Sequence, residues 1–396
     1  MKSNKIRLGE QCVVTSSKRF HLSERITQGV PFYCSKEIIK KFNGEDVTEC
    51  DYISEDLYKK VSNEFGVPKE NDLLITTRGT IGIPYLYKRT DRFYFADGNL
   101  TWIKDFDSNL YSKFLYYWFQ SYEGRKKFEA LAKGTAQKAV PISGIKTLEI
   151  ELPSLKSQKR IADILSAYDD LIENNQKQIK LLEEAAQRLY KEWFVDLRFP
   201  GHENTKIVDG VPEGWNEKTL SQVANVIMGQ SPKSEFYNSE KKGLPFHQGV
   251  GSYGVRFVID DIYSTSYTRI AEPNSILFSV RAPVGRLNIT KNKVVIGRGL
   301  AAINQTDGCQ SYLYYLLKNK FFKDNIVGNG AIFASVSKDE LLNQKFLIPE
   351  RNLMMQFEKI VSQMDKQIEN LDSKNKKLIE ARDRLLPKLM SGEVEA

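Results

Sequence analysis

Two long segments of the chain, 155–193 and 350–390, share one pattern of apolar and polar positions. Apolar residues recur in both at alternating spacings of three and four, which is typical of a helix that buries one narrow stripe. The pattern holds over five heptads and predicts a coiled coil. In the first segment the a positions are Leu165, Ile172, Ile179, Ala186 and Trp193, and the d positions are Ile161, Tyr168, Asn175, Leu182 and Leu189. In the second segment the a positions are Val361, Ile368, Asn375, Arg382 and Leu389, and the d positions are Phe357, Met364, Leu371, Leu378 and Leu385.

The alternative interpretation of each segment is a helix that packs against its own globular domain. The length of the pattern favours the coiled coil, because helices of globular cores rarely run beyond about 25 residues. The two segments are also copies of one another. A gap-free match at an offset of 196 runs from Pro153 against Pro349 to Leu189 against Leu385. The chain is therefore a tandem duplication, with a repeating unit far longer than that of a solenoid.

Each helical segment carries one asparagine on its apolar stripe, Asn175 at a d position and Asn375 at an a position. In an antiparallel pair a positions face d positions, so the two amides can meet. A parallel pair in the register of the repeat would leave both amides buried without partners. The antiparallel register also sets Tyr168 opposite Arg382, where we expect a cation–π contact. We therefore predict an intramolecular antiparallel coiled coil with its register fixed by Asn175 and Asn375.

Outside the helices, short apolar runs such as LLITT and LEIEL alternate with Gly-rich and Asn-rich breaks. This pattern predicts compact domains of short strands and few helices. The two halves still correspond here, but the offset drifts: Arg78 and Arg281 are 203 positions apart, whereas FLYYWFQS and YLYYLLKN are 198 apart. Insertions therefore accumulate in these parts, where the two halves are expected to differ in what they recognise.

The expected fold class is α/β, with two tandem, pseudo-symmetric α/β domains and two long helices between them. An antiparallel helix pair carries one domain at each end, and a helix of this length spans about 60 Å. The expected boundaries are 1–152 for the first α/β domain, 153–194 for the central helix, 195–215 for a linker rich in Pro and Gly, 216–348 for the second α/β domain and 349–396 for the C-terminal helix.

Composition narrows the classes of function. The net charge of +8 favours an anionic partner if the cations lie in the recognition parts. Four cysteines without a CxxC spacing and three separated histidines indicate neither a disulfide framework nor a metal site. No apolar run follows the basic N-terminal residues, and no stretch approaches about 18 apolar residues, so we expect no signal peptide, no membrane span and a cytoplasmic protein.

The whole chain resembles the specificity (S) subunit of type I restriction-modification systems. The resemblance rests on two domains that alternate with helical spacers and on three stretches of sequence. These are SQKRIADILSAYDDLIENNQKQIKLLEEAAQRLYKEWFVDLRFPG in the central spacer, VPEGWNEKTLSQVANVIMGQSP at the start of the second domain, and RDRLLPKLMSGEV near the C-terminus.

This resemblance implies a non-enzymatic subunit that binds double-stranded DNA. Each α/β domain would be a target-recognition domain that reads one half of a bipartite, asymmetric site. The coiled coil would set the gap between the halves and dock two methyltransferase (M) subunits, through which endonuclease/translocase (R) subunits join. S-adenosylmethionine would be bound by the methyltransferase, so no cofactor is expected in this chain.

The absence of catalytic motifs agrees with that reading. The sequence contains no Asn/Asp-Pro-Pro-aromatic tetrad, no GxxxxGK[ST] loop and no HExxH. Two rivals stay open from the sequence. One is a scaffold whose coiled coil and globular ends bind other proteins, and the other is an enzyme whose catalytic residues are distant in sequence and converge in the fold.

DNA contacts are expected from polar residues on loops, where cations, hydroxyls and amides reach phosphates and base edges. In the first domain the candidates are Ser17, Lys18, Arg19, Thr77, Arg78, Lys133, Thr135, Gln137 and Lys138. In the second domain they are Gln230, Ser231, Lys233, Gln248, Tyr253, Arg256, Arg281, Arg286, Arg298, Ser335 and Lys338.

Arg78 and Arg281 are the sharpest candidates, because each follows an apolar strand and precedes a turn glycine at matched positions of the two halves. A structural arginine that ties the strand to its loop is the alternative. The unlike segments KGTAQK and GNGAIFAS occupy equivalent positions, which two different readers or neutral drift would both produce. The loop SSKRF could equally be solvated and idle.

Overall fold

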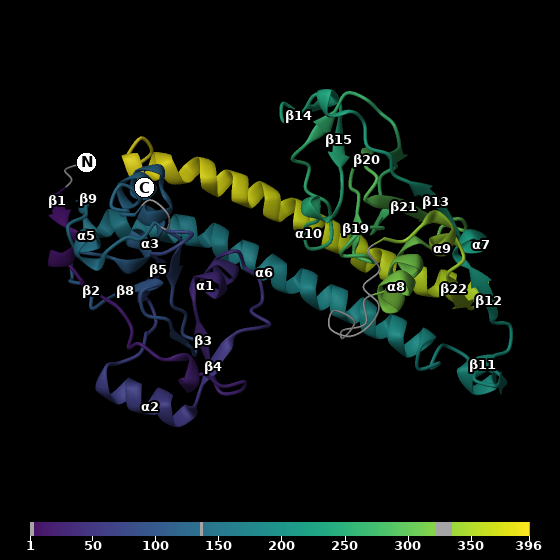
Figure 1. The fold of residues 1–396 in the computed structure, drawn as a ribbon, viewed down its shortest axis with the longest axis horizontal. Coiled ribbons are helices and arrows are strands. Elements are labelled where there is room, and N and C mark those ends of the chain that lie inside the picture. The colour runs from purple at the N-terminus through teal and green to yellow at the C-terminus, as the bar shows by residue number, and fades with distance from the viewer. Residues whose placement is uncertain (1–3, 135–137, 322–334, 396) are drawn as a thin grey trace. The chain divides into compact units, whose positions relative to one another are not determined.

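The computed structural model describes residues 4–134, 138–321 and 335–395. The chain divides into two compact units: unit 1 comprises residues 1–178 and 371–396, and unit 2 comprises residues 179–370. Each unit contains one α/β domain and part of each long helix, α6 (Leu155–Phe194) and α10 (Arg351–Ser391) (Figure 1).

The α/β domain of unit 1 is built on three small sheets with the strand orders β2-β8-β5-β6, β4-β3-β7 and β1-β9. The sequence explains the exposure of each strand. LLIT in β5 lies inside its sheet and is buried throughout, whereas EIEL in β9 alternates exposed and buried residues. The strands are β1 (Asn4–Arg7), β2 (Val13–Thr15), β3 (Val30–Tyr33), β4 (Asp51–Ile53), β5 (Leu73–Thr76), β6 (Pro84–Leu86), β7 (Tyr94–Phe95), β8 (Leu100–Lys104) and β9 (Glu149–Leu152). The helices are α1 (Ser35–Phe42), α2 (Glu55–Glu64), α3 (Ser112–Gln120), α4 (Tyr122–Glu129) and α5 (Ile142–Lys146).

The α/β domain of unit 2 repeats the architecture, with the strand orders β13-β21-β18-β19, β14-β16-β15-β20-β17 and β12-β22. Its strands are β12 (Asn216–Thr219), β13 (Ala224–Met228), β14 (Tyr237–Asn238), β15 (Leu244–His247), β16 (Tyr263–Ser264), β17 (Ile270–Ala271), β18 (Ile276–Ser279), β19 (Leu287–Ile289), β20 (Val294–Ile296), β21 (Leu300–Gln305) and β22 (Lys345–Ile348). Its helices are α7 (Leu220–Val223), α8 (Gln310–Phe321) and α9 (Lys338–Leu342).

Strand pairing relates the sheets of the two domains, although the second sheet has three strands in the first domain and five in the second. β2, β8, β5 and β6 correspond to β13, β21, β18 and β19, and all neighbours are antiparallel in both sheets. The second sheet of each domain contains one parallel pair, β3 with β7 and β15 with β20. The first and last strands of each domain also pair, β1 with β9 and β12 with β22. Two tandem α/β domains with long helices between them are therefore confirmed.

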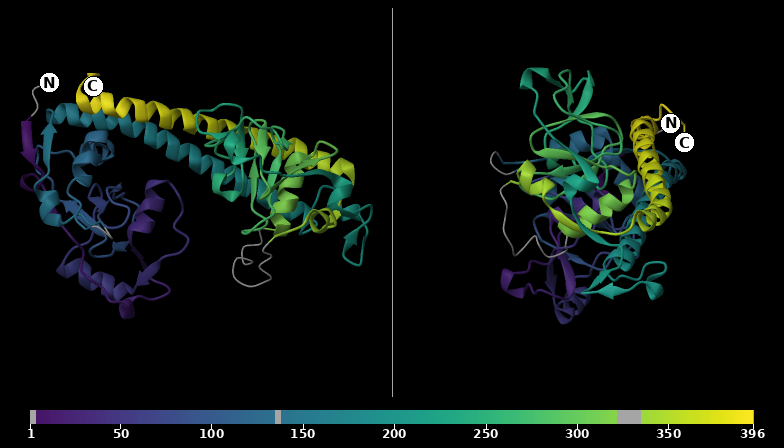
Figure 2. Two further views of the ribbon diagram at one scale, coloured as in Figure 1. Left: turned by 45° about the horizontal axis from the view of Figure 1, so that its top comes forward. Right: turned by 90° about the vertical axis from the view of Figure 1, so that its right-hand side faces the viewer.

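The long helices pack antiparallel, as the apolar stripes predict (Figure 2). In unit 1, Asn175 Nδ2 donates a hydrogen bond of 2.8 Å to Asn375 Oδ1, and the two residues are only 9% and 7% exposed. In unit 2, Trp193 packs on Phe357 with their ring centroids 5.9 Å apart. The seam pairing of Tyr168 with Arg382 did not form a cation–π contact, because Arg382 Nη1 instead pairs with Asp169 Oδ1 at 2.5 Å.

The helices also pack against the α/β domain of their own unit, so the two interpretations of the apolar stripes are both correct. In unit 2, Tyr190 of α6 and Phe357 of α10 share one core with Tyr312 and Tyr315 of α8. In unit 1, Leu165 of α6 belongs to the core that surrounds α3. Each helix therefore buries two faces, which explains how a helix of 40 residues is held along its length.

The segment 195–215 after α6 belongs to unit 2 and is more ordered than a linker of Pro and Gly suggests. Leu197 has a φ of 57°, and its left-handed backbone turns the chain away from the helix end. A 3₁₀ turn (His202–Asn204) and the short hairpin of β10 (Ile207–Val208) and β11 (Val211–Pro212) follow. Phe199 and Trp215 are buried with their ring centroids 5.5 Å apart, so the segment contributes to the core.

The buried amide pair gives a first prediction. Replacing Asn175 by Leu should lower the free energy of unfolding by about 1–3 kcal/mol, because the Asn375 amide loses its partner in a buried seam. The double variant Asn175→Leu/Asn375→Leu should lose much less than the sum of the single changes, because no polar group is left unpaired. Urea unfolding of the four proteins measures this, and additive losses would show that the amides are not coupled.

Candidate nucleic-acid interface

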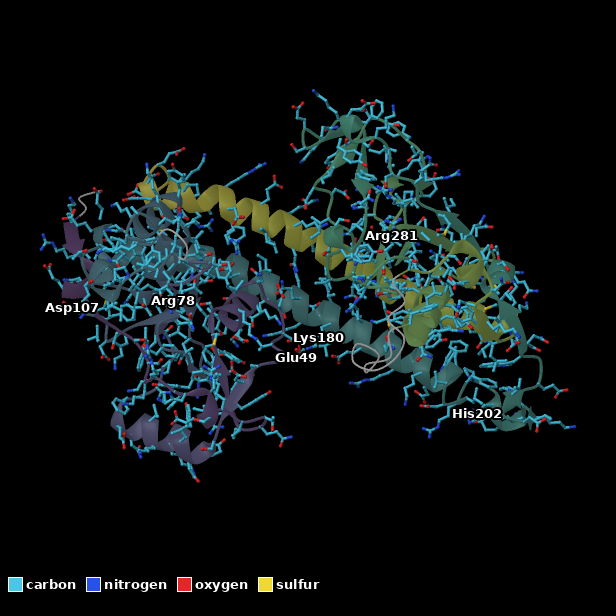
Figure 3. All side chains as sticks on the ribbon, viewed as in Figure 1. Glu49, Arg78, Asp107, Lys180, His202 and Arg281 are labelled. Carbon is cyan, nitrogen blue, oxygen red and sulfur yellow. The ribbon has the colours of Figure 1, made fainter. Side chains whose placement is uncertain are left out.

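Arg78 and Arg281 lie at equivalent places in the two α/β domains (Figure 3). Each lies two residues beyond a buried strand and starts a turn that ends at a glycine with positive φ, Gly82 (83°) or Gly285 (86°). The N–H of that glycine donates to the carbonyl of the last strand residue in both domains, over 2.8 and 3.0 Å. Both arginine side chains are exposed. The matched placement inferred from the sequence is therefore a real structural equivalence.

In the first domain, a returning segment lies beside this turn. Arg78 and Lys133 each form a β-bridge with Ala139, so the segment folds against the arginine turn. Lys133 and Lys138 are both exposed there. Three cationic side chains are thereby brought to one place, while the candidates Thr135 and Gln137 lie outside the described residues.

In the second domain, the equivalent bridge joins Arg281 to Ser335. Ser335 and Lys338 are exposed beside it, and Lys338 is the first residue of α9. From the aligned helix to this bridge the second domain is two residues shorter than the first, because the repeat offset falls from 198 to 196.

The other side of each arginine turn contacts the residues before β8 or β21. The N–H of Thr77 donates to the carbonyl of Asn99 over 2.9 Å, and the N–H of Val280 donates to the carbonyl of Gly299 over 2.9 Å. The Thr77 side chain is buried, so this candidate contributes to the position of the turn and not to an exposed surface.

The loop after β2 presents Lys18 and Arg19, whose side chains are exposed, whereas Ser17 is half-buried. The N–H of Lys18 donates to the hydroxyl of Tyr94 over 2.9 Å, which anchors the loop to the second sheet. The ammonium of Lys18 lies 4.7 Å from the ring centroid of Phe65. The guanidinium of Arg19 is oriented by Asp97, whose Oδ2 accepts from Arg19 Nε over 3.0 Å.

The equivalent loop of the second domain, after β13, presents Gln230 and Lys233 to solvent. Ser231 is half-buried, and its hydroxyl donates to Gln248 Oε1 over 2.8 Å. Arg298, in the turn before β21, is exposed, and its backbone N–H donates to Ser231 Oγ over 3.2 Å. Five of the second-domain candidates are thus brought together by the fold.

Two further candidates have structural contacts. Tyr253 is half-buried and donates its hydroxyl to the carbonyl of Leu277 over 2.9 Å. Burial raises the pKa of Tyr253, so its phenol stays a neutral donor. Arg286 is half-buried, and its backbone N–H donates to Ser279 Oγ over 2.8 Å, which closes the Arg281 turn.

Arg256 does not lie on the candidate interface, which corrects its assignment from the sequence. The residue is 2% exposed. Its Nη1 lies 3.2 Å from Glu183 Oε1 of α6, and its Nη2 pairs with Asp365 of α10. The guanidinium also lies 4.4 Å from the ring centroid of Tyr314. A buried cation between two carboxylates and an aromatic ring joins the recognition domain to both long helices, and DNA cannot reach it.

Unit 1 has a related contact at the repeat-equivalent carboxylate. Asp169 of α6 lies 196 positions before Asp365, and its Oδ2 accepts from the Tyr117 hydroxyl of α3 over 2.6 Å. Its other oxygen accepts from Arg382 of α10. Burial raises the pKa of Tyr117, and the charge of Asp169 raises it further, so the phenol remains a donor.

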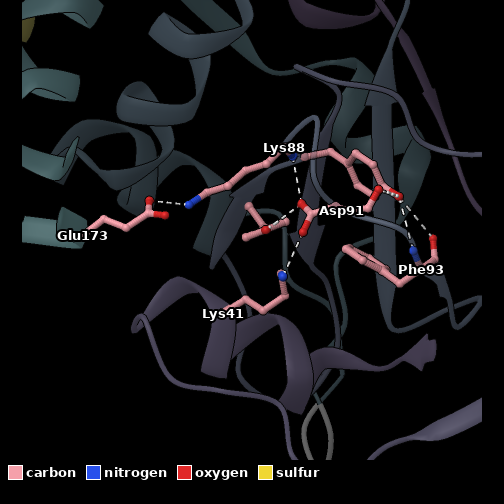
Figure 4. A network of polar contacts seen from close by, with 7 residues as sticks. Lys41, Lys88, Asp91, Phe93 and Glu173 are labelled. Atoms are coloured by element: carbon pink, nitrogen blue, oxygen red, sulfur yellow. Dashed lines mark hydrogen bonds and ion pairs between the residues drawn. The ribbon is translucent and has the colours of Figure 1, made fainter. Parts of the chain in front are cut away.

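A second contact joins α6 to the first domain further along the helix (Figure 4). Lys88 Nζ lies 2.5 Å from Glu173 Oε2 of α6. The backbone N–H of Lys88 donates to Asp91, whose carboxylate also accepts from the Tyr85 hydroxyl over 2.7 Å and pairs with Lys41 at 2.9 Å. The loop that carries Lys88 is therefore held within the domain by hydrogen bonds and by the ion pair of Asp91 with Lys41.

The family model "Type I restriction modification DNA specificity domain" matches residues 3–184 and 212–381, which is most of the chain and includes both α/β domains. The chain belongs to the type I restriction-modification specificity subunits. It is thus the non-catalytic DNA specificity subunit of such a system, and Arg78 and Arg281 lie in its two DNA specificity domains.

Individual relatives agree with this assignment. The chain is 30% identical over 326 residues to the putative type I restriction enzyme MjaX specificity subunit of Methanocaldococcus jannaschii, covering 81% of this chain and 77% of the relative. It is 25% identical over 361 residues to the type I restriction enzyme HindI specificity subunit of Haemophilus influenzae, covering 71% of this chain and 77% of the relative. The fold resembles the crystal structure of the type I restriction-modification S subunit from M. genitalium, with a TM-score of 0.62, 20% identity, and 98% and 96% of the two chains covered.

Two further observations concern the described residues of this specificity subunit. Within 4–134, 138–321 and 335–395, no three His, Cys, Asp or Glu side chains gather as a metal site would require. Over the same ranges, no helix combines the length and the apolar character needed to cross a membrane.

The sequence did not point to several residues that hold the candidate side chains in place. Asp97 orients Arg19, and Glu183 and Asp365 hold Arg256, yet none of them was a candidate. Asp365 did carry a signal, because the repeat places a carboxylate at the same position of both helices, where Asp169 is the counterpart. Asp97 carried none, because its role depends on a turn that lies next to the β2 loop only in the folded domain.

The buried position of Arg256 gives a second prediction. Replacing Arg256 by Met should lower the free energy of unfolding by about 3–5 kcal/mol, because two partly buried carboxylates lose their counter-charge. The matched control Arg298→Met should change it by less than about 0.5 kcal/mol, because Arg298 is exposed. Urea unfolding compares the two variants, and equal small effects would show that Arg256 does not hold the domain on the helices.

Proposed function

We propose that each α/β domain is a target-recognition domain that reads one half of a bipartite, asymmetric DNA site, with residues 1–152 and 216–348 as the two readers. The observation that carries this proposal is the equivalence of the Arg78 and Arg281 turns in two domains that share a four-stranded sheet of the same order but carry unlike loops. Two recognition domains that arose by duplication need equivalent side chains for the phosphate contacts and different side chains for the bases.

The two long helices act in this proposal as the spacer that sets the gap between the half-sites. Residues 153–194 and 349–396 form this spacer, with residues 195–215 joining the first helix to the second domain. A 40-residue helix such as α6 rises about 60 Å, which exceeds one turn of B-DNA at about 34 Å.

The partners follow from the family. Specificity subunits are part of a type I restriction-modification complex, and we infer that this chain docks two methyltransferase subunits on its helices and, through them, endonuclease/translocase subunits. The methyltransferase would bind S-adenosylmethionine and modify adenine, so this chain needs no cofactor. We place the complex in the cytoplasm, where its DNA lies.

The arrangement predicts a methylation motif. When the chain is expressed with its cognate methyltransferase subunit, methylated adenines mapped by single-molecule sequencing should fall in a two-part asymmetric motif with a fixed unspecified gap. Inserting one heptad at facing positions of both helices lengthens the spacer by about 10 Å. The gap should then grow by about three base pairs at 3.4 Å per step, with both half-sites unchanged. A continuous motif in the parent complex would contradict the two-reader proposal.

The arginine turns predict a salt dependence. Replacing either Arg78 or Arg281 by Ala should weaken DNA binding and reduce the slope of log affinity against log salt by about one, because one phosphate contact is lost. The matched control Arg89→Ala removes an exposed arginine outside the interface and should leave the slope unchanged. Fluorescence anisotropy over a range of salt concentrations measures the slopes. If the affinity of the parent complex for DNA did not depend on salt, the result would favour the rival hypothesis of a scaffold that binds other proteins.

A further inference from the structure

Each recognition domain contains a hollow at the same place in its fold. The hollow of the first domain, about 620 Å³, is lined by the loop after β2, by Phe32 of β3 and by residues 96–99 before β8. The hollow of the second domain, about 720 Å³, is lined by the loop after β13, by Phe246 of β15 and by Arg298 before β21. The lining elements correspond pairwise, so the two hollows are one site that the duplication produced twice.

The floor of the site is the same in both copies. Phe32 lies opposite Tyr94 in the parallel pair of β3 and β7, and Phe246 lies opposite Val295 in the parallel pair of β15 and β20. Both phenylalanines are buried, at 2% and 4% exposure, and therefore support the hollow from below. The rims differ between the copies, which is where two readers of different half-sites must differ.

In the second domain, close backbone packing shapes the rim. A Cβ on Gly297 would lie 2.5 Å from Gln248 Oε1, and a Cβ on Gly299 would lie 2.5 Å from the Gln248 carbonyl oxygen. A Cβ on Gly229 would lie 2.1 Å from the carbonyl oxygen of Gly297. Three glycines therefore let the loop after β13, the turn before β21 and the end of β15 meet at one point.

Hydrogen bonding then fixes the direction of the Gln248 amide. Ser231 donates its hydroxyl hydrogen to Gln248 Oε1 over 2.8 Å, and Ser231 Oγ accepts from the backbone N–H of Arg298 over 3.2 Å. The amide oxygen of Gln248 is thus engaged by the loop, and the exposed side chain keeps its NH₂ donors for a ligand. Arg298 is exposed, and its guanidinium has no hydrogen bond or ion pair to any other described residue. The rim therefore presents donors.

In the first domain, the rim presents the guanidinium of Arg19, whose Nε donates to Asp97. Asp97 uses both oxygens, accepting from Ser16 Oγ over 2.8 Å and from Arg19 Nε over 3.0 Å. The Arg19 side chain is 76% exposed, and its two Nη groups have no hydrogen bond or ion pair within the described residues. An arginine oriented through Nε offers its Nη groups as a planar fork.

We propose that these two hollows are the base-reading sites of the two domains, in which Arg19 oriented by Asp97 and Gln248 together with Arg298 each recognise the edge of a guanine. The proposal rests on the proposed function and adds the chemical class of what is read. Guanine presents two acceptors, N7 and O6, in the major groove, and it is the base that a rim of donors fits.

The test is the methylation motif of the complex with its cognate methyltransferase, determined for the parent chain and for Arg19→Lys and Gln248→Glu. Lysine keeps the charge that a phosphate contact needs but loses the planar fork. Glutamate keeps the size of Gln248 but replaces its donors by acceptors. Each variant should lower discrimination at one guanine position by about 5- to 150-fold, and the two should act on opposite half-sites.

Matched controls and a second variant complete the experiment. Arg89→Lys and Gln28→Glu make the same changes at exposed positions outside the hollows and should leave the motif unchanged. Arg298→Lys should relax the same half-site as Gln248→Glu, which covers the case in which the glutamate variant fails to fold. The guanine assignment would be overturned if the motif were unchanged in both Arg19→Lys and Arg298→Lys, or if all variants affected the same half-site. It would also be overturned if a stable complex lost methylation uniformly at all sites. A continuous motif in the parent complex would instead overturn the two-reader proposal.

Discussion

The hydrogen bond between Asn175 and Asn375 is the constraint on which much of the molecule depends. An apolar seam alone allows a helix pair to slide by a heptad, because one layer of leucines resembles the next. A buried amide pair removes that freedom, since any other register leaves two polar groups without partners. The register in turn sets which residues of α6 and α10 lie side by side, including Asp169 with Arg382 in unit 1 and Trp193 with Phe357 in unit 2.

The recognition domains are attached to this frame by a repeated device. At the N-terminal end of the short helix of each domain, α3 or α8, backbone N–H groups donate to a side chain of a long helix of the same unit. In unit 1, the side chain of Gln158 accepts from the N–H of Tyr111, and in unit 2 the carboxylate of Glu358 accepts from the N–H groups of Ser311 and Tyr312. The two acceptors occupy different positions of the repeat but satisfy the same exposed ends of a helix.

Much of the architecture follows from local patterns. The heptads, the two seam asparagines and the matched Arg78 and Arg281 turns were visible in the sequence because each depends on spacing along the chain. The burial of Arg256 was not visible, because it follows from contacts with Glu183 and Asp365, which lie 73 and 109 positions away. A loop arginine beside glycines has the same local pattern whether it faces solvent or a pair of carboxylates. The roles of Asp97 and Gln248 depend in the same way on segments brought together only by the sheets.

The unequal partners of Asp169 and Asp365 place different demands on a domain transplanted onto the long helices. In unit 1 the cation that neutralises the Asp169 carboxylate comes from the other helix, so at this position a replacement first domain needs to supply a hydroxyl at the place of Tyr117 and no cation. In unit 2 the cation belongs to the recognition domain itself. A replacement second domain must bring its own arginine to the position of Arg256, so its attachment to the helices has one requirement that the first domain does not share.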